Sequence, residues 1–177
     1  SIGSELARQV AGYGPSELVL LDHAENGLYY VHNELSAQHP GLPMHPIVAD
    51  IQDKRGLEFV FERLSPTVVF HAAAHKHVPL LELNPREAVF NNIVGTRNLV
   101  DAADRHGVKK FVLISTDFVY HPTHRRFPQP EEASHWASAE TTPYGYKKHL
   151  CELELIEGDT GQMGWTILRP CHIYGPT

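Results

Sequence analysis

Short apolar runs of strand length alternate with helical patterns along most of the chain. The runs are "ELVLLD" (Glu17 to Asp22), "HPIVAD" (His45 to Asp50), "TVVFHA" (Thr67 to Ala72), "KFVLIS" (Lys110 to Ser115) and "WTILRP" (Trp165 to Pro170). Between them, apolar residues recur every three or four positions, which is the period of an amphipathic helix. This alternation predicts one α/β domain, a Rossmann-like doubly wound parallel sheet covered on both faces by helices.

The clearest helix start lies at Asn84. Asn84 is a good cap, Pro85 suits the first helical position, and Glu87 stands where a capping-box acid reaches back. The apolar period then continues to Gly107, which predicts a helix of about six turns. A polar, proline-containing loop is expected over residues 121–142, followed by a helix from Tyr144 to Gly158.

Both ends of the chain depart from the expected plan. A sheet of this class begins with a strand that leads into a glycine-rich turn, whereas this chain opens at "SIGSEL". We therefore expect residues 1–177 to be a Rossmann domain truncated at both ends, without its first strand and without a C-terminal substrate lobe. The missing strand would leave a slot between the strands at residues 18–21 and 68–70.

Composition and charge narrow the function classes. The 177 residues include 15 Lys and Arg against 21 Asp and Glu, a net charge of −6, so no nucleic-acid partner is expected. No stretch approaches the roughly 18 apolar residues of a membrane span, and no secretory signal opens the chain. Cys151 and Cys171 lack metal-ligand or redox spacing, which favours a reducing, cytoplasmic setting. A homo-oligomer remains possible.

The first strand and the helix before it carry a candidate cofactor site. The turn at Ser1, Ile2 and Gly3 could hold a pyrophosphate on backbone amides, and Asp22, 19 residues after Gly3, could bind a ribose hydroxyl. An acid at this position would repel the 2′-phosphate of NADP, so NAD is favoured over NADP. Asp50 and Ile51, after the second strand, could bracket the adenine. In each case a plain strand-end aspartate is the alternative.

Thr116, Tyr144 and Lys148 form the candidate catalytic set. Tyr144 and Lys148 lie four residues apart in a predicted helix, so they share one face. An ammonium beside the phenol would lower the tyrosine pKa from about 10 towards the range of a general base. Thr116, at the carboxyl end of the fourth strand, could share the hydrogen bond to a substrate hydroxyl.

The chain resembles the extended short-chain dehydrogenase/reductase superfamily. Residues 1 to about 117 are similar to CapD-like polysaccharide-biosynthesis proteins, a nucleotide-sugar 4,6-dehydratase group, through "AAAHKHVPLLELNPREAVFNNIVGT" and "KKFVLISTD". The resemblance implies that Ala72, Ala73 and Ala74 let the backbone approach the cofactor. It also implies substrate-binding roles for His75, Lys76 and Asn92. No metal is expected at His71, His75 and His77, because no carboxylate or thiol accompanies them.

Beyond Asp117 the resemblance changes. The dehydratase group continues "STDKAVNPTN", whereas this chain reads "STDFVYHPTH", with Phe118 in place of a catalytic lysine. The remainder is similar to the NAD-dependent epimerase/dehydratase family, with Tyr144 and Lys148 on its YxxxK motif. Arg169 to Pro176 match its "RPxxxYGP" motif, which implies that Pro170 borders the cofactor.

These resemblances imply an NAD(P)-dependent nucleotide-sugar epimerase or 4,6-dehydratase that works through a 4-keto sugar in polysaccharide biosynthesis. Asp117 could act as the acid in a dehydration, but Phe118 removes the evident base. A nucleotide 4-keto-sugar reductase is one alternative, since "STDFVY" also resembles the reductases. A non-catalytic, cofactor-binding regulator is another.

Overall fold

The structure, a computed structural model, describes residues 1–120 and 143–170. Within them five strands run parallel to their neighbours: β1 (Leu18–Asp22), β2 (Met44–Val48), β3 (Val68–His71), β4 (Lys110–Ile114) and β5 (Gly164–Leu168). Each coincides with a predicted strand to within two residues at either end. The predicted parallel α/β fold is therefore confirmed.

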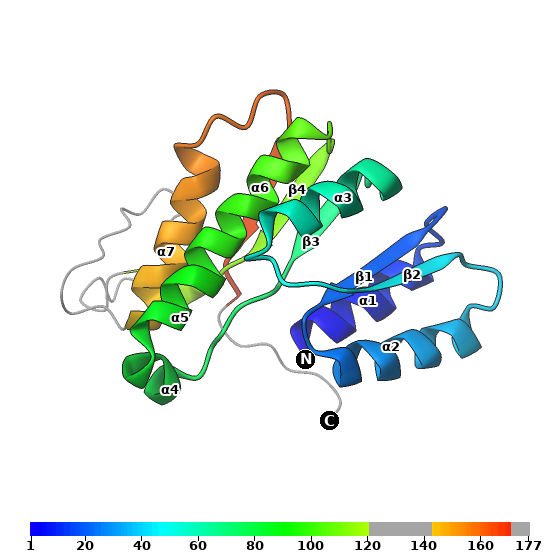
Figure 1. Cartoon of the computed structure of the whole chain (residues 1–177), viewed down its shortest axis with the longest axis horizontal. Helices are drawn as coiled ribbons and strands as arrows, with labels where there is room; N and C mark the ends of the chain where they lie inside the picture. Colours follow the sequence, from blue (N-terminus) through cyan, green and yellow to red (C-terminus); the bar gives the residue numbers. More distant parts are fainter. Residues whose placement is uncertain (121–142, 171–177) are drawn as a thin grey trace.

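The strands form two separate sheets that lie side by side (Figure 1). One sheet pairs β1 with β2, with Leu18 opposite Met44, and the other has the order β3-β4-β5. In the described part of the chain no ladder joins β1 to β3. This is the slot that the sequence predicted between these two strands.

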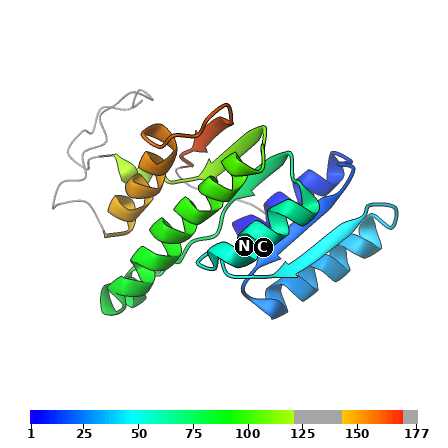
Figure 2. The same cartoon turned by 45° about the horizontal axis from the view of Figure 1, so that its top comes forward.

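Helices cover the two sheets from opposite faces (Figure 2). They are α1 (Ile2–Gly12), α2 (Glu25–Gln38), α3 (Lys54–Leu64), α4 (Val78–Leu83), α5 (Pro85–Val89), α6 (Gly95–Arg105) and α7 (Pro143–Ile156). Leu20 of β1 belongs to a core with α1 and α2, whereas its neighbour Leu21 packs against the core of α3, α6 and α7. Because adjacent side chains of a strand point to opposite faces, the two cores lie on opposite sides of β1.

The structure differs in two ways from the single helix predicted between residues 84 and 107. Its middle, Phe90–Val94 (η1), is a single turn of π-helix between α5 and α6, and α4 precedes it where no helix was expected. Asn84 precedes α5, but its side-chain Nδ2 donates to Leu80 O (3.0 Å) instead of capping α5. The expectation of an Asn84 side-chain cap was therefore wrong, because the amide closes the preceding helix instead. The predicted loop at residues 121–142 lies outside the described residues.

Candidate active site

Two of the predicted cofactor-binding residues, Gly3 and Ala72, lie together at the carboxyl end of β3. A Cβ placed on Gly3, at the start of α1, would lie 4.0 Å from Cβ of Ala72, which follows β3. The ring of His23, after β1, meets the ring of His75 with a centroid distance of 6.0 Å. The start of α1 and the ends of β1 and β3 therefore lie together, as in a dinucleotide-binding crevice.

The residues at this edge fit a dinucleotide. Ser1 caps α1 by accepting a hydrogen bond from Ser4 N (3.2 Å), and Ser1, Ile2 and Gly3 are exposed. Asp22 is exposed at the end of β1, where its Oδ1 accepts from Ala24 N (2.9 Å). A helix N-terminus suits a pyrophosphate and a carboxylate suits a ribose hydroxyl. A Cβ at Gly3 would be in ordinary van der Waals contact with Ala72, so α1 begins beside the loop that follows β3.

The loop after β2 has one exposed and one buried residue among those predicted to bind the cofactor. Asp50 is exposed and its Oδ1 accepts from Gln52 N (2.8 Å). Ile51 is buried, and a Cβ on Gly95 would lie only 2.6 Å from its side chain. Asn98 of α6 holds this loop by donating to the Ile51 carbonyl (3.2 Å). Of the two residues predicted to bracket an adenine, only Asp50 presents its side chain to solvent.

Asn92 holds the loop that follows β3. Its Oδ1 accepts from His75 N (2.8 Å) and from Asn91 Nδ2 (2.9 Å), and its Nδ2 donates to His75 O (2.9 Å), so both ends of the amide bind the loop backbone. The backbone carbonyl of Asn92 accepts from Cys151 Sγ (2.9 Å) on α7. Asn92 is buried, whereas Lys76 is exposed and His75 half-buried. The structure thus gives Asn92 a contact with the loop itself, while Lys76 has the exposure that a substrate-binding role requires.

The three histidines considered as metal ligands, His71, His75 and His77, lie in different surroundings. His71 is buried, and its Nε2 lies 2.8 Å from Oγ1 of Thr96, a hydroxyl that donates to Asn92 O. His75 lies in the loop held by Asn92, and His77 is exposed immediately before α4. Within residues 1–120 and 143–170 no group of His, Cys, Asp and Glu could hold a metal ion.

The turn after β4, which carries Thr116 and Asp117, packs against α7, which carries Tyr144 and Lys148. That turn is a short 3-10 helix, Asp117–Val119 (η2), capped by the Thr116 hydroxyl, which accepts from Phe118 N (3.3 Å). The ring of Phe118 lies edge-on to the ring of Tyr144, with centroids 6.4 Å apart. A Cβ on Gly145 would come within 2.2 Å of Phe118 O, so only glycine allows α7 to approach this closely. The Asp117 side chain is partly buried beside Thr116.

The electrostatics of Tyr144 differ from the sequence prediction. Burial, followed by the neighbouring Cys151, raises the pKa of the Tyr144 phenol above its ordinary value. Lys148 is also buried, which lowers the pKa of its ammonium, and its Nζ donates to Ile114 O (2.8 Å). The expected lowering of the tyrosine pKa by Lys148 was therefore wrong for this structure, because desolvation dominates.

Sequence reasoning missed a polar cluster behind this site. Glu152 of α7 is fully buried and bonded to Arg169 (2.8 Å) and to Ser115 Oγ, and Arg169 also donates to Tyr120 OH (3.0 Å). The sequence did contain a signal for Glu152, since this residue continues the four-residue spacing of Tyr144 and Lys148. Pro170 O, next in the chain, accepts from Asp117 N (3.4 Å). The rest of the predicted 169–176 motif lies outside the described residues.

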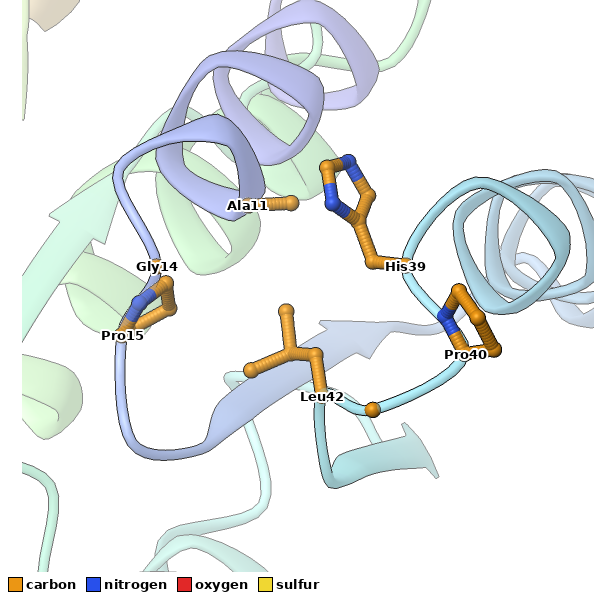
Figure 3. A pocket seen from close by; sticks show the side chains of 7 residues that line it. Ala11, Gly14, Pro15, His39, Pro40 and Leu42 are labelled. Carbon is orange, nitrogen blue, oxygen red and sulfur yellow. The ribbon is translucent and has the colours of Figure 1, made fainter.

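A shallow hollow of about 300 Å³ lies where α1 and α2 end (Figure 3). His39 and Leu42 face Ala11 across it. It adjoins the amino end of β1, away from the carboxyl ends where the candidate site lies. None of the described helices has the length and apolar character needed to cross a bilayer.

The parallel sheet and the helix carrying Tyr144 and Lys148 define the chain as a Rossmann-type member of the short-chain dehydrogenase/reductase superfamily. Residues 1–125 match the family described as polysaccharide biosynthesis protein. The chain belongs to this family.

Two relatives by sequence match well over half of the chain. The chain is 47% identical over 124 residues to the capsular polysaccharide biosynthesis protein CapD of Staphylococcus aureus, which covers 70% of this chain and 21% of that protein. It is 34% identical over 110 residues to a UDP-N-acetylglucosamine 4,6-dehydratase (inverting) of Campylobacter jejuni, covering 62% of this chain and 31% of that enzyme. The chain therefore spans less than a third of the length of these two relatives.

Solved structures match nearly the whole chain. The UDP-glucose 4-epimerase of Thermotoga maritima, solved with UDP-glucose, has a TM-score of 0.83 and 26% identity over 99% of this chain and 54% of its own. The enzyme WbmG of Bordetella bronchiseptica, solved with NAD, has a TM-score of 0.75 and 26% identity over 96% of this chain and 49% of its own. The structural similarity thus extends past residue 125, the end of the family match.

Proposed function

We propose that the protein carrying this chain is an NAD-dependent, cytoplasmic nucleotide-sugar epimerase or dehydratase, and that 4-epimerisation is its outcome. Relatives named as a nucleotide-sugar dehydratase and an epimerase support the class. The choice of epimerisation over dehydration rests on the position of Phe118. Its exposed ring stands edge-on to Tyr144, at the position where the dehydratase pattern has a lysine.

The chain's own residues have distinct parts in this proposal. Bound nicotinamide would accept the 4-hydride and add positive charge near the phenol. Tyr144 takes the proton of the sugar 4-hydroxyl, and Lys148 supplies a cation one helical turn away. Asp22 and the start of α1 bind the dinucleotide, and the carboxylate of Asp22 favours NAD over NADP.

Epimerisation and dehydration make different demands after the first step. Dehydration removes the C5 proton and the 6-hydroxyl, so it needs a second base and an acid. Asp117 is an available acid beside Thr116, but Phe118 contributes no base. Epimerisation needs only the return of hydride to the other face of the keto sugar, which the Tyr144, Lys148 and Thr116 set can support.

Proton NMR with UDP-N-acetylglucosamine in deuterated water tests the proposal. We expect inversion at C4 without deuterium at C5, and loss of turnover in Tyr144→Phe. Deuterium at C5 with loss of the 6-hydroxyl would establish dehydration instead, and stoichiometric consumption of free NADH or NADPH would establish a reductase. Retained cofactor without turnover of any nucleotide sugar would point to a regulator. We expect Phe118→Lys to introduce exchange of the C5 proton for deuterium. An unchanged product would show that Phe118 does not decide between epimerisation and dehydration.

A further inference from the structure

A buried ion pair lies directly behind the candidate catalytic residues. Glu152 is one helical turn after Lys148 on α7 and is 0% exposed. Arg169, which follows β5, donates from Nε to Glu152 Oε1 (3.1 Å) and from Nη2 to Oε2 (2.8 Å). The same carboxylate accepts a hydrogen bond from Ser115 Oγ, so it joins α7 to the ends of both β4 and β5.

The ion pair holds the turn η2 at both of its ends. Ser115 precedes the turn and is bonded to Glu152. Tyr120 follows the turn, and its hydroxyl accepts from Arg169 Nη1 (3.0 Å) while its ring lies 5.3 Å from the guanidinium carbon. Phe118, between these two attachments, meets the start of α7 through its ring and its carbonyl.

Stability alone is a weak reason for such a pair. Taking a carboxylate and a guanidinium out of water carries a desolvation cost that their attraction often only balances. Well-packed apolar side chains could fill the same space. What apolar side chains could not supply is directional attachment of three backbone segments to one another.

We propose that Glu152 and Arg169 are positioning residues, which fix the turn bearing Thr116, Asp117 and Phe118 against Tyr144. The inference rests on the proposed function, since it assigns these two residues to the same reaction. They touch neither substrate nor cofactor in it, and act through Ser115 at one end of the turn and Tyr120 at the other.

Two variants each detach one end of the turn while leaving the ion pair in place. Ser115→Ala and Tyr120→Phe remove a single hydroxyl. We expect each to lower kcat about tenfold, because small misplacements of reacting groups are costly, with KM, the affinity for NAD and the melting temperature nearly unchanged. Glu152→Gln, which loses the charge, should lower kcat further. The matched control is Glu154→Gln on the same helix, whose carboxylate lies 3.9 Å from Arg97 on the other side, and it should leave kcat unchanged.

A second measurement does not depend on turnover. Amide hydrogen exchange should become about tenfold faster at Asp117, Phe118 and Tyr120 in the Ser115→Ala and Tyr120→Phe proteins, and stay unchanged in Glu154→Gln. Unchanged exchange and unchanged kcat, with only a lower melting temperature in Glu152→Gln, would overturn the proposal and leave the pair a stabilising role. If no nucleotide sugar is turned over, the proposed function fails, and the exchange measurement alone decides whether Glu152 and Arg169 fix the turn.

Discussion

The buried side chain of His71, at the end of β3, affects the stability of the whole chain. Burial, with the charge of Lys148 nearby, lowers the pKa of His71 to about 3. Because the Thr96 hydroxyl donates to Asn92 O, it must accept from His71, so the neutral ring carries its proton on Nε2. His71 is therefore a neutral core residue whose Nε2 is occupied by the hydrogen bond to Thr96.

This assignment predicts a loss of stability in acid. The unfolded chain binds a proton on this histidine below about pH 6.5, whereas the folded chain does not do so until about pH 3. The contribution is fully present above pH 6.5 and is lost as the pH falls towards 3. Between pH 7.5 and 5 the free energy of unfolding should drop by about 2 kcal/mol more in the natural chain than in His71→Gln. Urea unfolding at the two pH values measures the difference; parallel losses in both proteins would show that His71 is protonated in the folded state.

At the residue scale, spacing predicted some positions of the site and missed others. Tyr144, Lys148 and Thr116 were found because they follow local rules of helix period and strand end. The contact of Asn92 with the loop could not be found, because it depends on the path of the backbone at His75, 17 residues away. The raised pKa of Tyr144 was missed for a similar reason, since burial is a property of the packed molecule and not of a four-residue spacing.

At the scale of elements, the approach of α7 to the turn η2 depends on one glycine. Gly145 is the third residue of α7, and a Cβ there would lie 2.2 Å from Phe118 O. Gly27 is the third residue of α2 and has open space around it. The two glycines therefore occupy the same helical position with opposite steric surroundings.

Alanine at these two positions should act in opposite directions. Gly27→Ala should raise the free energy of unfolding by up to about 1 kcal/mol through helix propensity. Gly145→Ala should lower it by about 1–3 kcal/mol, the usual cost of overpacking, and should reduce turnover because Phe118 moves relative to Tyr144. Chemical denaturation of both variants provides the comparison. If Gly145→Ala proved as stable as Gly27→Ala, α7 would have to lie farther from η2 than the structure places it.

The elements themselves were largely readable from the sequence, except for α4 and for the π-turn inside the predicted helix. Strands buried in a parallel sheet read as apolar runs, which is why all five were found. The π-turn at Phe90–Val94 was not found, because one extra residue in a helical turn leaves the apolar period nearly intact. This turn includes Asn92, so the irregularity coincides with the residue that binds the His75 loop.

At the scale of the whole molecule, the sheet is divided between β1 and β3. The bond from Leu18 N to Pro43 O and the bond from Ala49 N to Asp22 O show that alternate residues of β1 face β2. By strand alternation, Val19 and Leu21 direct their backbone groups away from β2. On β3, Thr67 O accepts from Lys109 N, so Val68 and Phe70 face away from β4.

The division predicts an alternating pattern of amide exchange in this 177-residue chain. Amides that face a ladder partner, such as those of Leu20 and Val69, should be protected by the core. Those of Val19, Leu21, Val68 and Phe70 should exchange about tenfold faster or more, because no strand of the described structure pairs with them. Residue-resolved exchange by NMR separates neighbours on one strand, so each strand supplies its own control. Equal protection along β1 and β3 would mean that another segment pairs with both edges and completes a single sheet, and the description as two sheets would then be wrong.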